Sequence, residues 1–200
     1  NDPLKEIPGR LVLERLTELS RRQGDFPWHV AFHPYPQNLF EPRFWNDTQA
    51  TLSFDTPKVT FKNIEVLTAF LDREDMRFAG RPRRVALTEQ GFHTPDGDAG
   101  EAIQAAAYAA AWVRVRDLEG IDAFMVHRHV SHPGEGGLRL GLWTHDAEGG
   151  SASAPGRKKA IWEVVRLADT RQWREAFAFA LPIVGIADWK ELAPGKVKEE

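Results

Sequence analysis

The stretch Arg84-Val85-Ala86-Leu87-Thr88-Glu89-Gln90-Gly91 decides the fold class, because it reads as a short buried strand that ends in polar side chains. Its continuous apolar run is typical of a strand covered on both faces, as in a parallel sheet. A helical pattern ending at Gly80 precedes it, and a second helical pattern ending at Gly120 follows it. Glycine is a common residue just after a helix, so both glycines mark boundaries.

The order helix, glycine, strand occurs three times along the chain. In the second unit, Thr60 is the expected N-cap of the helix, and Ile64, Leu67 and Leu71 form its apolar stripe. The predicted helices cover residues 10–23, the segment between 60 and 80, and residues 101–118, and the predicted strands cover 26–32, 84–88 and 121–126. Strands that alternate with helices predict an α/β fold with a parallel sheet.

The remainder of the chain is predicted to extend this unit. The Gly-rich turn 134–137 leads into residues 138–143, whose alternation indicates a hairpin-like arm. A loop over 146–156 and helices over 157–168 and 170–180 follow. We therefore expect one domain over residues 1–200, with core βα units in 10–168 and a terminal helix and tail in 169–200.

Composition excludes several classes of protein. The chain has 200 residues, of which 42% are hydrophobic and 28% charged, and this balance is typical of a folded domain. The net charge of −3 disfavours nucleic acid and anionic membranes as partners, and the longest uncharged apolar run, 102–113, is too short to cross a membrane. The absence of cysteine excludes disulfides and thiolate chemistry. No Walker loop, G-x-G-x-x-G or G-x-S-x-G motif is present, so no cofactor is expected.

Each predicted strand ends in side chains that can do chemistry. These are His33 and Tyr35, then Glu89 and Gln90, then His127 and His129. Because parallel strands place their carboxyl ends at one edge of the sheet, we expect the six side chains to share a site. Glu89 stands at the mouth of an apolar core, where it either reacts or forms a structural ion pair with Arg83 or Arg84.

Two tryptophans are candidate platforms for a flat ligand. Trp143 follows Gly141 at the end of the predicted arm, and Trp45 lies in the long loop after the first strand. Either ring can stack on a sugar or base, or can simply cover the core.

The histidines raise a metal-dependent alternative. His127 and His129 form an H-x-H pair, and alternation along a strand would point both imidazoles to one face. The sequence has no H-E-x-x-H, so hydrogen-bonding histidines that orient a substrate are the preferred interpretation and no metal is assigned.

Several of these motifs resemble a known family. The run 84–92 resembles the seventh strand of clan A retaining glycoside hydrolases, which are (β/α)₈ barrels with a nucleophilic Glu at that position. His33-Pro34-Tyr35 resembles the end of their sixth strand, and Gly141-Leu142-Trp143 resembles the eighth-strand Trp below the sugar. Together with 88–91 and His127-Arg128-His129, these motifs are similar to an uncharacterised bacterial family of glycosidase-like barrels, over residues 10–168.

The resemblance implies roles for these residues. Glu89 would attack the anomeric carbon and form a covalent glycosyl intermediate, while Tyr35 or His33 would donate a hydrogen bond to it. The carbohydrate would be bound by Trp143, Trp45, Gln90, His127 and His129.

The chain also departs from the family pattern. Clan A enzymes carry an acid/base residue on strand four, whereas this chain matches only strands six to eight, so we expect that residue upstream of Asn1. Glu135, Asp96 and Asp98 are carboxylates that could approach Glu89. A barrel needs about 250 residues, so the chain is expected to be its C-terminal part, with the sheet edge covered by upstream strands or a second copy. A non-catalytic carbohydrate-binding module is the main alternative, and sugar, linkage and compartment stay open.

Overall fold

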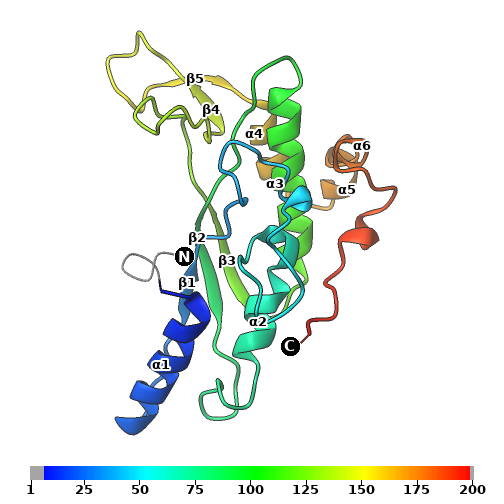
Figure 1. Cartoon of the computed structure of the whole chain (residues 1–200). Helices are drawn as coiled ribbons and strands as arrows, with labels where there is room; N and C mark the ends of the chain where they lie inside the picture. Colours follow the sequence, from blue (N-terminus) through cyan, green and yellow to red (C-terminus); the bar gives the residue numbers. More distant parts are fainter. Residues whose placement is uncertain (1–6, 199–200) are drawn as a thin grey trace.

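The computed structural model describes residues 7–198 and contains a three-stranded parallel sheet (Figure 1). Its strands are β1 (Val30–Phe32), β2 (Val85–Gln90) and β3 (Ile121–Val126), arranged in the order β1-β2-β3. Val30 pairs with Val85 and Leu87 with Phe124. The predicted α/β fold with a parallel sheet is confirmed. Residues 1–6 and 199–200 of the expected domain lie outside the described residues.

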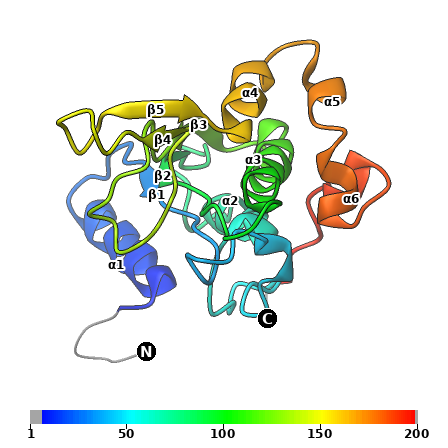
Figure 2. The ribbon, with the colours of Figure 1, turned by 90° about the horizontal axis from the view of Figure 1, so that it is seen from above.

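Two helices connect the strands, and both lie on the same side of the sheet (Figures 1 and 2). α2 (Glu65–Leu71) joins β1 to β2, and α3 (Gly100–Arg116) joins β2 to β3. The predicted stripe of Ile64, Leu67 and Leu71 is buried in the core. This layer therefore holds the sheet in place from one face.

α3 is buried on more than its sheet-facing side. The alanines over 105–107 and 109–111 are all fully buried, because α4 (Ala160–Leu167) and α6 (Ala180–Val184) pack against α3 as well. A helix that is apolar all round is covered all round. Small side chains let these neighbours approach the helix axis closely.

Several boundaries differ from the sequence-based prediction. α1 (Gly9–Arg22) and β3 match closely, but β1 begins at Val30, because residues 25–29 turn around the Arg83 side chain. Thr60 does act as an N-cap, although it caps a 3₁₀ helix, η2 (Phe61–Asn63), through a reciprocal bond with Asn63. α2 follows it and ends nine residues before Gly80.

The predicted hairpin arm over 138–143 is wrong. Only Trp143 of that segment is in a strand. β4 (Trp143–His145) pairs antiparallel with β5 (Pro155–Lys158), and most of the loop expected over 146–156 connects the two strands. Since 155–158 is extended, the next helix begins at Ala160 rather than at 157.

The C-terminal part consists of short helices. The predicted helix over 170–180 is divided into α5 (Trp173–Ala176) and α6, and a 3₁₀ helix, η3 (Trp189–Leu192), follows. A further 3₁₀ helix, η1 (Phe44–Asn46), lies in the loop after β1. No helix within residues 7–198 is long and apolar enough to span a membrane.

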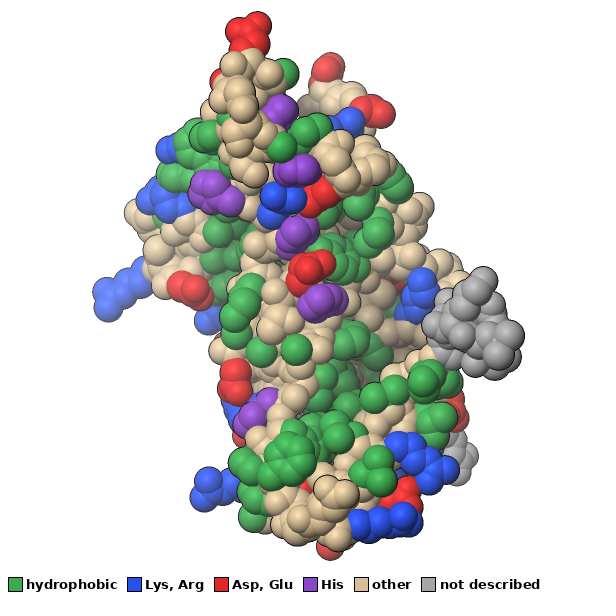
Figure 3. Space-filling model, turned by 90° about the vertical axis from the view of Figure 1, so that its left-hand side faces the viewer, with side chains coloured by type: hydrophobic (Ala, Val, Ile, Leu, Met, Phe, Trp, Pro, Cys, Tyr) green, Lys and Arg blue, Asp and Glu red, His purple; other side chains and the backbone are tan. Residues whose placement is uncertain are grey.

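The face of the molecule opposite α2 and α3 carries several histidine and acidic side chains. Figure 3 shows histidine side chains following one another along this face, with acidic side chains between them. The sheet side chains that alternate away from the helices include Ala31 and Met125, both exposed. Among the described residues the sheet has three strands and stays open at β1 and β3.

Candidate functional site

The ends of β1 and β2 are joined by one hydrogen bond. The Tyr35 hydroxyl donates to Glu89 Oε1 at 2.9 Å. Burial raises the pKa of Tyr35 above its ordinary value, and the bond to Glu89 raises it further. Tyr35 therefore remains a neutral donor, and the contact expected from the sequence is present.

Glu89 does not pair with an arginine, so the structural ion-pair alternative is wrong. Arg83 and Arg84 lie at the opposite, amino end of β2 and bind other carboxylates. Arg83 Nη2 contacts Asp25 at 2.8 Å, and Arg84 Nη2 contacts Asp122 at 2.6 Å. Because the two arginines lie at the amino end of β2 and Glu89 lies at its carboxyl end, neither guanidinium neutralises Glu89.

His33 contacts the same strand but a different residue. Its Nε2 lies 3.1 Å from Thr88 Oγ1. Of the two expected donors to Glu89, the structure thus selects Tyr35, and His33 supports the strand beside it.

A second carboxylate, Glu135, forms a cluster just beyond β3. Its Oε1 accepts a 2.6 Å hydrogen bond from Arg128 Nη1 and lies 3.0 Å from His127 Nε2. Burial opposes ionisation of Glu135, but the bonds from Arg128 and His127 outweigh it and hold the pKa below its usual range. The negative charge of Glu135 also raises the pKa of Tyr35, so this cluster adjoins the Glu89 contact.

Glu135 is the residue whose importance the sequence reasoning underrated. It lies between two glycines in a turn, and this context indicated a loop rather than a site. Its Oε2 atom is buried and has no hydrogen-bond partner among residues 7–198. The sequence did offer one indication of this cluster: Glu135 is an acidic residue a few positions after His127 and Arg128, which follow the predicted strand.

His127 and His129 do not face one another as an H-x-H pair on a strand. β3 ends at Val126, so strand alternation does not apply to the two histidines that follow it. His127 contacts Glu135, whereas the His129 ring lies against Trp143, with ring centroids 6.3 Å apart. Trp143 Nε1 is buried without a partner in the described part of the chain.

Gln90 and Trp45 take structural positions. Gln90 is 1% exposed, and its amide Nε2 donates to the Met125 carbonyl, which ties β2 to β3. Trp45 lies in η1 and packs edge-on against Phe44 at 5.4 Å, partly buried against the core. The geometry therefore leaves both out of the candidate site.

Metal binding is not favoured by the geometry. Within residues 7–198, no three His, Asp or Glu side chains converge in a way that could hold a metal ion. The two histidines of the metal-dependent alternative are instead separated by their contacts with Glu135 and Trp143.

The candidate site therefore comprises Glu89, Tyr35, His127, Glu135, His129 and Trp143. It offers one carboxylate bound by a neutral hydroxyl, a second carboxylate bound by an arginine and a histidine, and an aromatic ring beside another histidine. Two of its polar atoms, Glu135 Oε2 and Trp143 Nε1, are buried and unpartnered in the described residues. Unpaired buried polar atoms are costly unless a ligand or water binds them. The arrangement suits a ligand rich in hydroxyl groups.

Comparison with known proteins places the chain in a family of unknown function. Residues 1–192 match the family model described as a family of unknown function, DUF5722, so the chain belongs to this family. No curated protein and no solved structure matches the chain.

Proposed function

We propose that this chain carries the nucleophile of a retaining glycoside hydrolase, with its sheet forming strands six to eight of a (β/α)₈ barrel. The hydrogen bond from Tyr35 to Glu89 is the observation that carries the proposal. It joins the ends of two adjacent parallel strands, which is where active sites of such barrels lie. It also leaves Glu89 without a cationic partner among the described residues, as a nucleophile requires.

The chemistry follows from the two oxygen atoms of Glu89. Oε1 is held by the Tyr35 hydroxyl, which fixes the orientation of the carboxylate. Oε2 attacks the anomeric carbon, forming a C–O bond while the glycosidic bond breaks and the leaving oxygen takes a proton from an acid. Water then displaces Glu89 from the sugar, and the net reaction is hydrolysis of an O-glycosidic bond.

The remaining side chains bind the sugar. Trp143 offers its ring to the apolar face of a pyranose and its unpartnered Nε1 to a hydroxyl oxygen. Glu135 Oε2 accepts a hydroxyl proton, while Arg128 and His127 hold that carboxylate in place. His129 supports the Trp143 ring from the side.

The acid/base is assigned to a group outside these residues. A retaining mechanism needs a second carboxyl about 5–5.5 Å from the nucleophile that can carry a proton. Arg128 and His127 hold the pKa of Glu135 below its usual range, so this carboxyl is not suited to donate a proton. Asp96 is exposed to solvent and binds Arg139 at 2.7 Å.

The surface of α1 supports further polypeptide beside the sheet. α1 buries the small polar residues Thr17 and Ser20, while Leu11, Val12 and Leu19 are exposed. The outer edges of β1 and β3 are also unpaired within residues 7–198. Open edges are usually covered, so the proposal places upstream barrel strands or a second copy there.

A mechanism-based reagent tests the proposal without needing the acid. 2-Deoxy-2-fluoroglycosyl fluorides have a leaving group that departs without protonation, and the fluorine at C2 slows release of the intermediate. We expect one member of a panel of gluco, galacto, manno and xylo reagents to add one fluorosugar per chain, as measured by intact mass. Glu89→Gln should abolish the adduct, since an amide is not nucleophilic.

Glu74→Gln is the matched control, because Glu74 is an exposed glutamate in the loop after α2. It should label like the wild type. An adduct that persists in Glu89→Gln, or no adduct with any reagent, would contradict the proposed role of Glu89.

A carbohydrate-binding module without catalysis is the second candidate. The lowered pKa of Glu135 favours it, because this carboxyl is a poor proton donor. In that case, oligosaccharides would bind with similar affinity to the wild type and to Glu89→Gln, and no reagent would label the chain.

A further inference from the structure

A second cavity lies beside the candidate site and has a buried lysine in its wall. It encloses about 900 Å³ between the loop after β2, the loop after β3 and the β4–β5 ribbon. Its polar lining includes Thr94, Ser131, His132, Thr144, His145 and Lys159. A cavity of this size accommodates a sugar unit.

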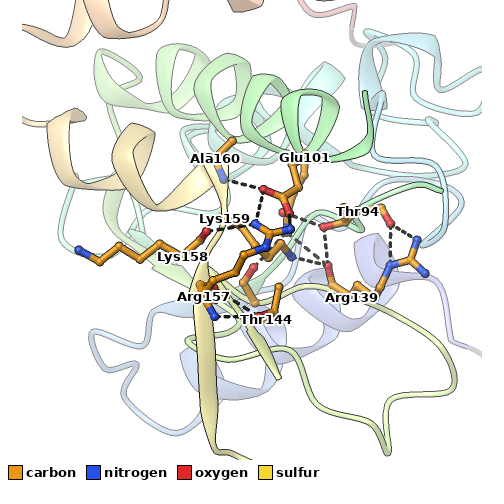
Figure 4. Close-up of polar contacts among 10 residues, drawn as sticks. Thr94, Glu101, Arg139, Thr144, Arg157, Lys158, Lys159 and Ala160 are labelled. Carbon is orange, nitrogen blue, oxygen red and sulfur yellow. Dashed lines mark hydrogen bonds and ion pairs between the residues drawn. The ribbon is translucent and has the colours of Figure 1, made fainter. Parts of the chain in front are cut away.

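Lys159 is the least satisfied charge of this cavity (Figure 4). The residue is 5% exposed, and its Nζ donates one hydrogen bond, to the Arg139 carbonyl at 3.1 Å. An ammonium has three donors. Within residues 7–198, no carboxylate lies within ion-pair distance of Nζ, although Glu101 is near enough to act on it electrostatically. Burial lowers the pKa of Lys159 to about 7.

The arginines of the cavity, unlike Lys159, already have carboxylate partners. Arg157 Nη2 contacts Glu101 at 2.5 Å (Figure 4). Arg139 Nη2 contacts Asp96 at 2.7 Å. Glu101 also accepts a bond from the Ala160 amide at the start of α4. One further acid, Asp98, lies on the exposed rim of the cavity. Lys159 is therefore the inner charge that remains for a ligand.

The histidines of the lining are held in place by backbone groups. His132 Nδ1 accepts a bond from the Gly134 amide, and His145 Nε2 lies 3.1 Å from the Ser151 carbonyl. Their ring edges belong to the cavity wall together with the Ser131 and Thr144 hydroxyls. Groups of this kind bind sugar hydroxyls around a central charge.

Two short segments of the chain link the cavity wall to residues of the candidate site. Glu135 belongs to the loop 131–139, and residues 131–133 and 137–139 of this loop line the cavity. Trp143 is followed directly by Thr144 and His145 in the cavity wall, and the Ser131 amide donates to the Trp143 carbonyl at 3.0 Å. A chain of sugar units that stacks on Trp143 can thus extend into the cavity.

We propose that this cavity binds the carboxylate of a uronate unit through Lys159, next to the sugar unit held at Glu89. The inference rests on the proposed function and specifies its substrate class as acidic glycans. A carboxylate supplies acceptors for the free donors of the ammonium and removes the cost of burying an unpaired charge. Binding also draws a proton onto Lys159, because the neighbouring anion favours the charged form.

Titration calorimetry with trigalacturonate and with a neutral galactose trisaccharide tests the inference. The wild type should bind trigalacturonate at least about tenfold more tightly, as expected for one charge-assisted contact. Lys159→Met should lose this preference, whereas Lys190→Met, which removes the same charge from an exposed position, should keep it. His132→Gln provides a second lining variant that leaves Lys159 in place, and circular dichroism confirms that each variant is folded.

A direct readout of Lys159 separates ligand binding from a purely structural role. In ¹³C-lysine NMR, trigalacturonate should move the Lys159 titration to higher pH, and the neutral trisaccharide should not. Equal binding of both sugars, unchanged preference in Lys159→Met, or no binding would overturn the inference. Fluorosugar labelling depends on Glu89, whereas the preference for trigalacturonate depends on Lys159, so either proposal can fail while the other stands.

Discussion

The charged side chains at the two ends of β2 differ in how their charge is compensated. At the amino end, the Arg83 side chain is 1% exposed, yet it binds Asp25, the carbonyls of Phe26 and Met76, and the Trp28 ring at 3.8 Å. At the carboxyl end, Glu89 has a single bond to a phenol. A fully neutralised charge stabilises the fold, whereas a charge held by a neutral donor can still react.

In the proposed function, this contrast separates the reactive end of β2 from the end that stabilises the fold. Lys159 follows the same pattern as Glu89, since a backbone carbonyl is its one hydrogen-bond partner among the described residues. Barrel and open α/β folds divide stability and activity between their two edges in the same way. The predictions below test that division, beginning with the largest expected effect.

Removing the charge of Asp25 should destabilise the fold strongly. Asp25→Asn leaves the Arg83 guanidinium buried without a counter-ion, which costs about 3 kcal/mol of unfolding free energy. Asparagine tolerates the positive φ of 51° at this position, so backbone strain does not contribute. Urea denaturation measures the change.

The neighbouring pair gives the control. Arg84 and Asp122 are both more than 40% exposed, and breaking an exposed pair costs about 0–1 kcal/mol. If Asp122→Asn destabilised the protein as much as Asp25→Asn, burial would not explain the difference between the two arginines.

Lys159 should make the stability depend on pH above neutrality. Its pKa is about 7 in the folded protein and near 10.5 in the unfolded chain, so the unfolded chain binds more protons between these values. The unfolding free energy should therefore rise from pH 7 to pH 9, by about 2–3 kcal/mol more than in Lys159→Met. Parallel slopes for the two proteins would show that burial does not penalise this ammonium.

Tyr35→Phe should have the smallest effect. Losing the hydroxyl that orients Glu89 should slow fluorosugar labelling about tenfold, the usual worth of a hydrogen bond to a charged group. The chain has two tyrosines, and Tyr108→Phe makes the same chemical change on α3, away from Glu89. Equal rates for both variants would remove Tyr35 from the mechanism.

The sequence predicted the local fold well where burial is continuous. β2, β3 and α3 were located from apolar runs and terminal glycines. Residues 26–29 do not form the expected strand: they are irregular, and Arg83, distant in sequence, binds Asp25 and the Phe26 carbonyl at their start. β5 was missed because the run 155–158 is polar and pairs with β4 across a loop.

The site was predicted in part. The Tyr35 contact with Glu89 follows from parallel strands ending at one edge. The cluster of His127, Arg128 and Glu135 depends on a loop that folds back over eight residues, and no periodic pattern encodes such a return. Gln90 was expected to face the ligand, but its amide completes the pairing of β2 with β3.

Locating the fluorosugar on the chain tests the central claim most directly. Tandem mass spectrometry of the digested adduct distinguishes Glu89 from Glu135 and Asp96, which lie on different stretches of sequence. We predict attachment at Glu89 alone. Attachment at Glu135 would contradict the account, because it would make the carboxylate held by Arg128 and His127 the reactive one.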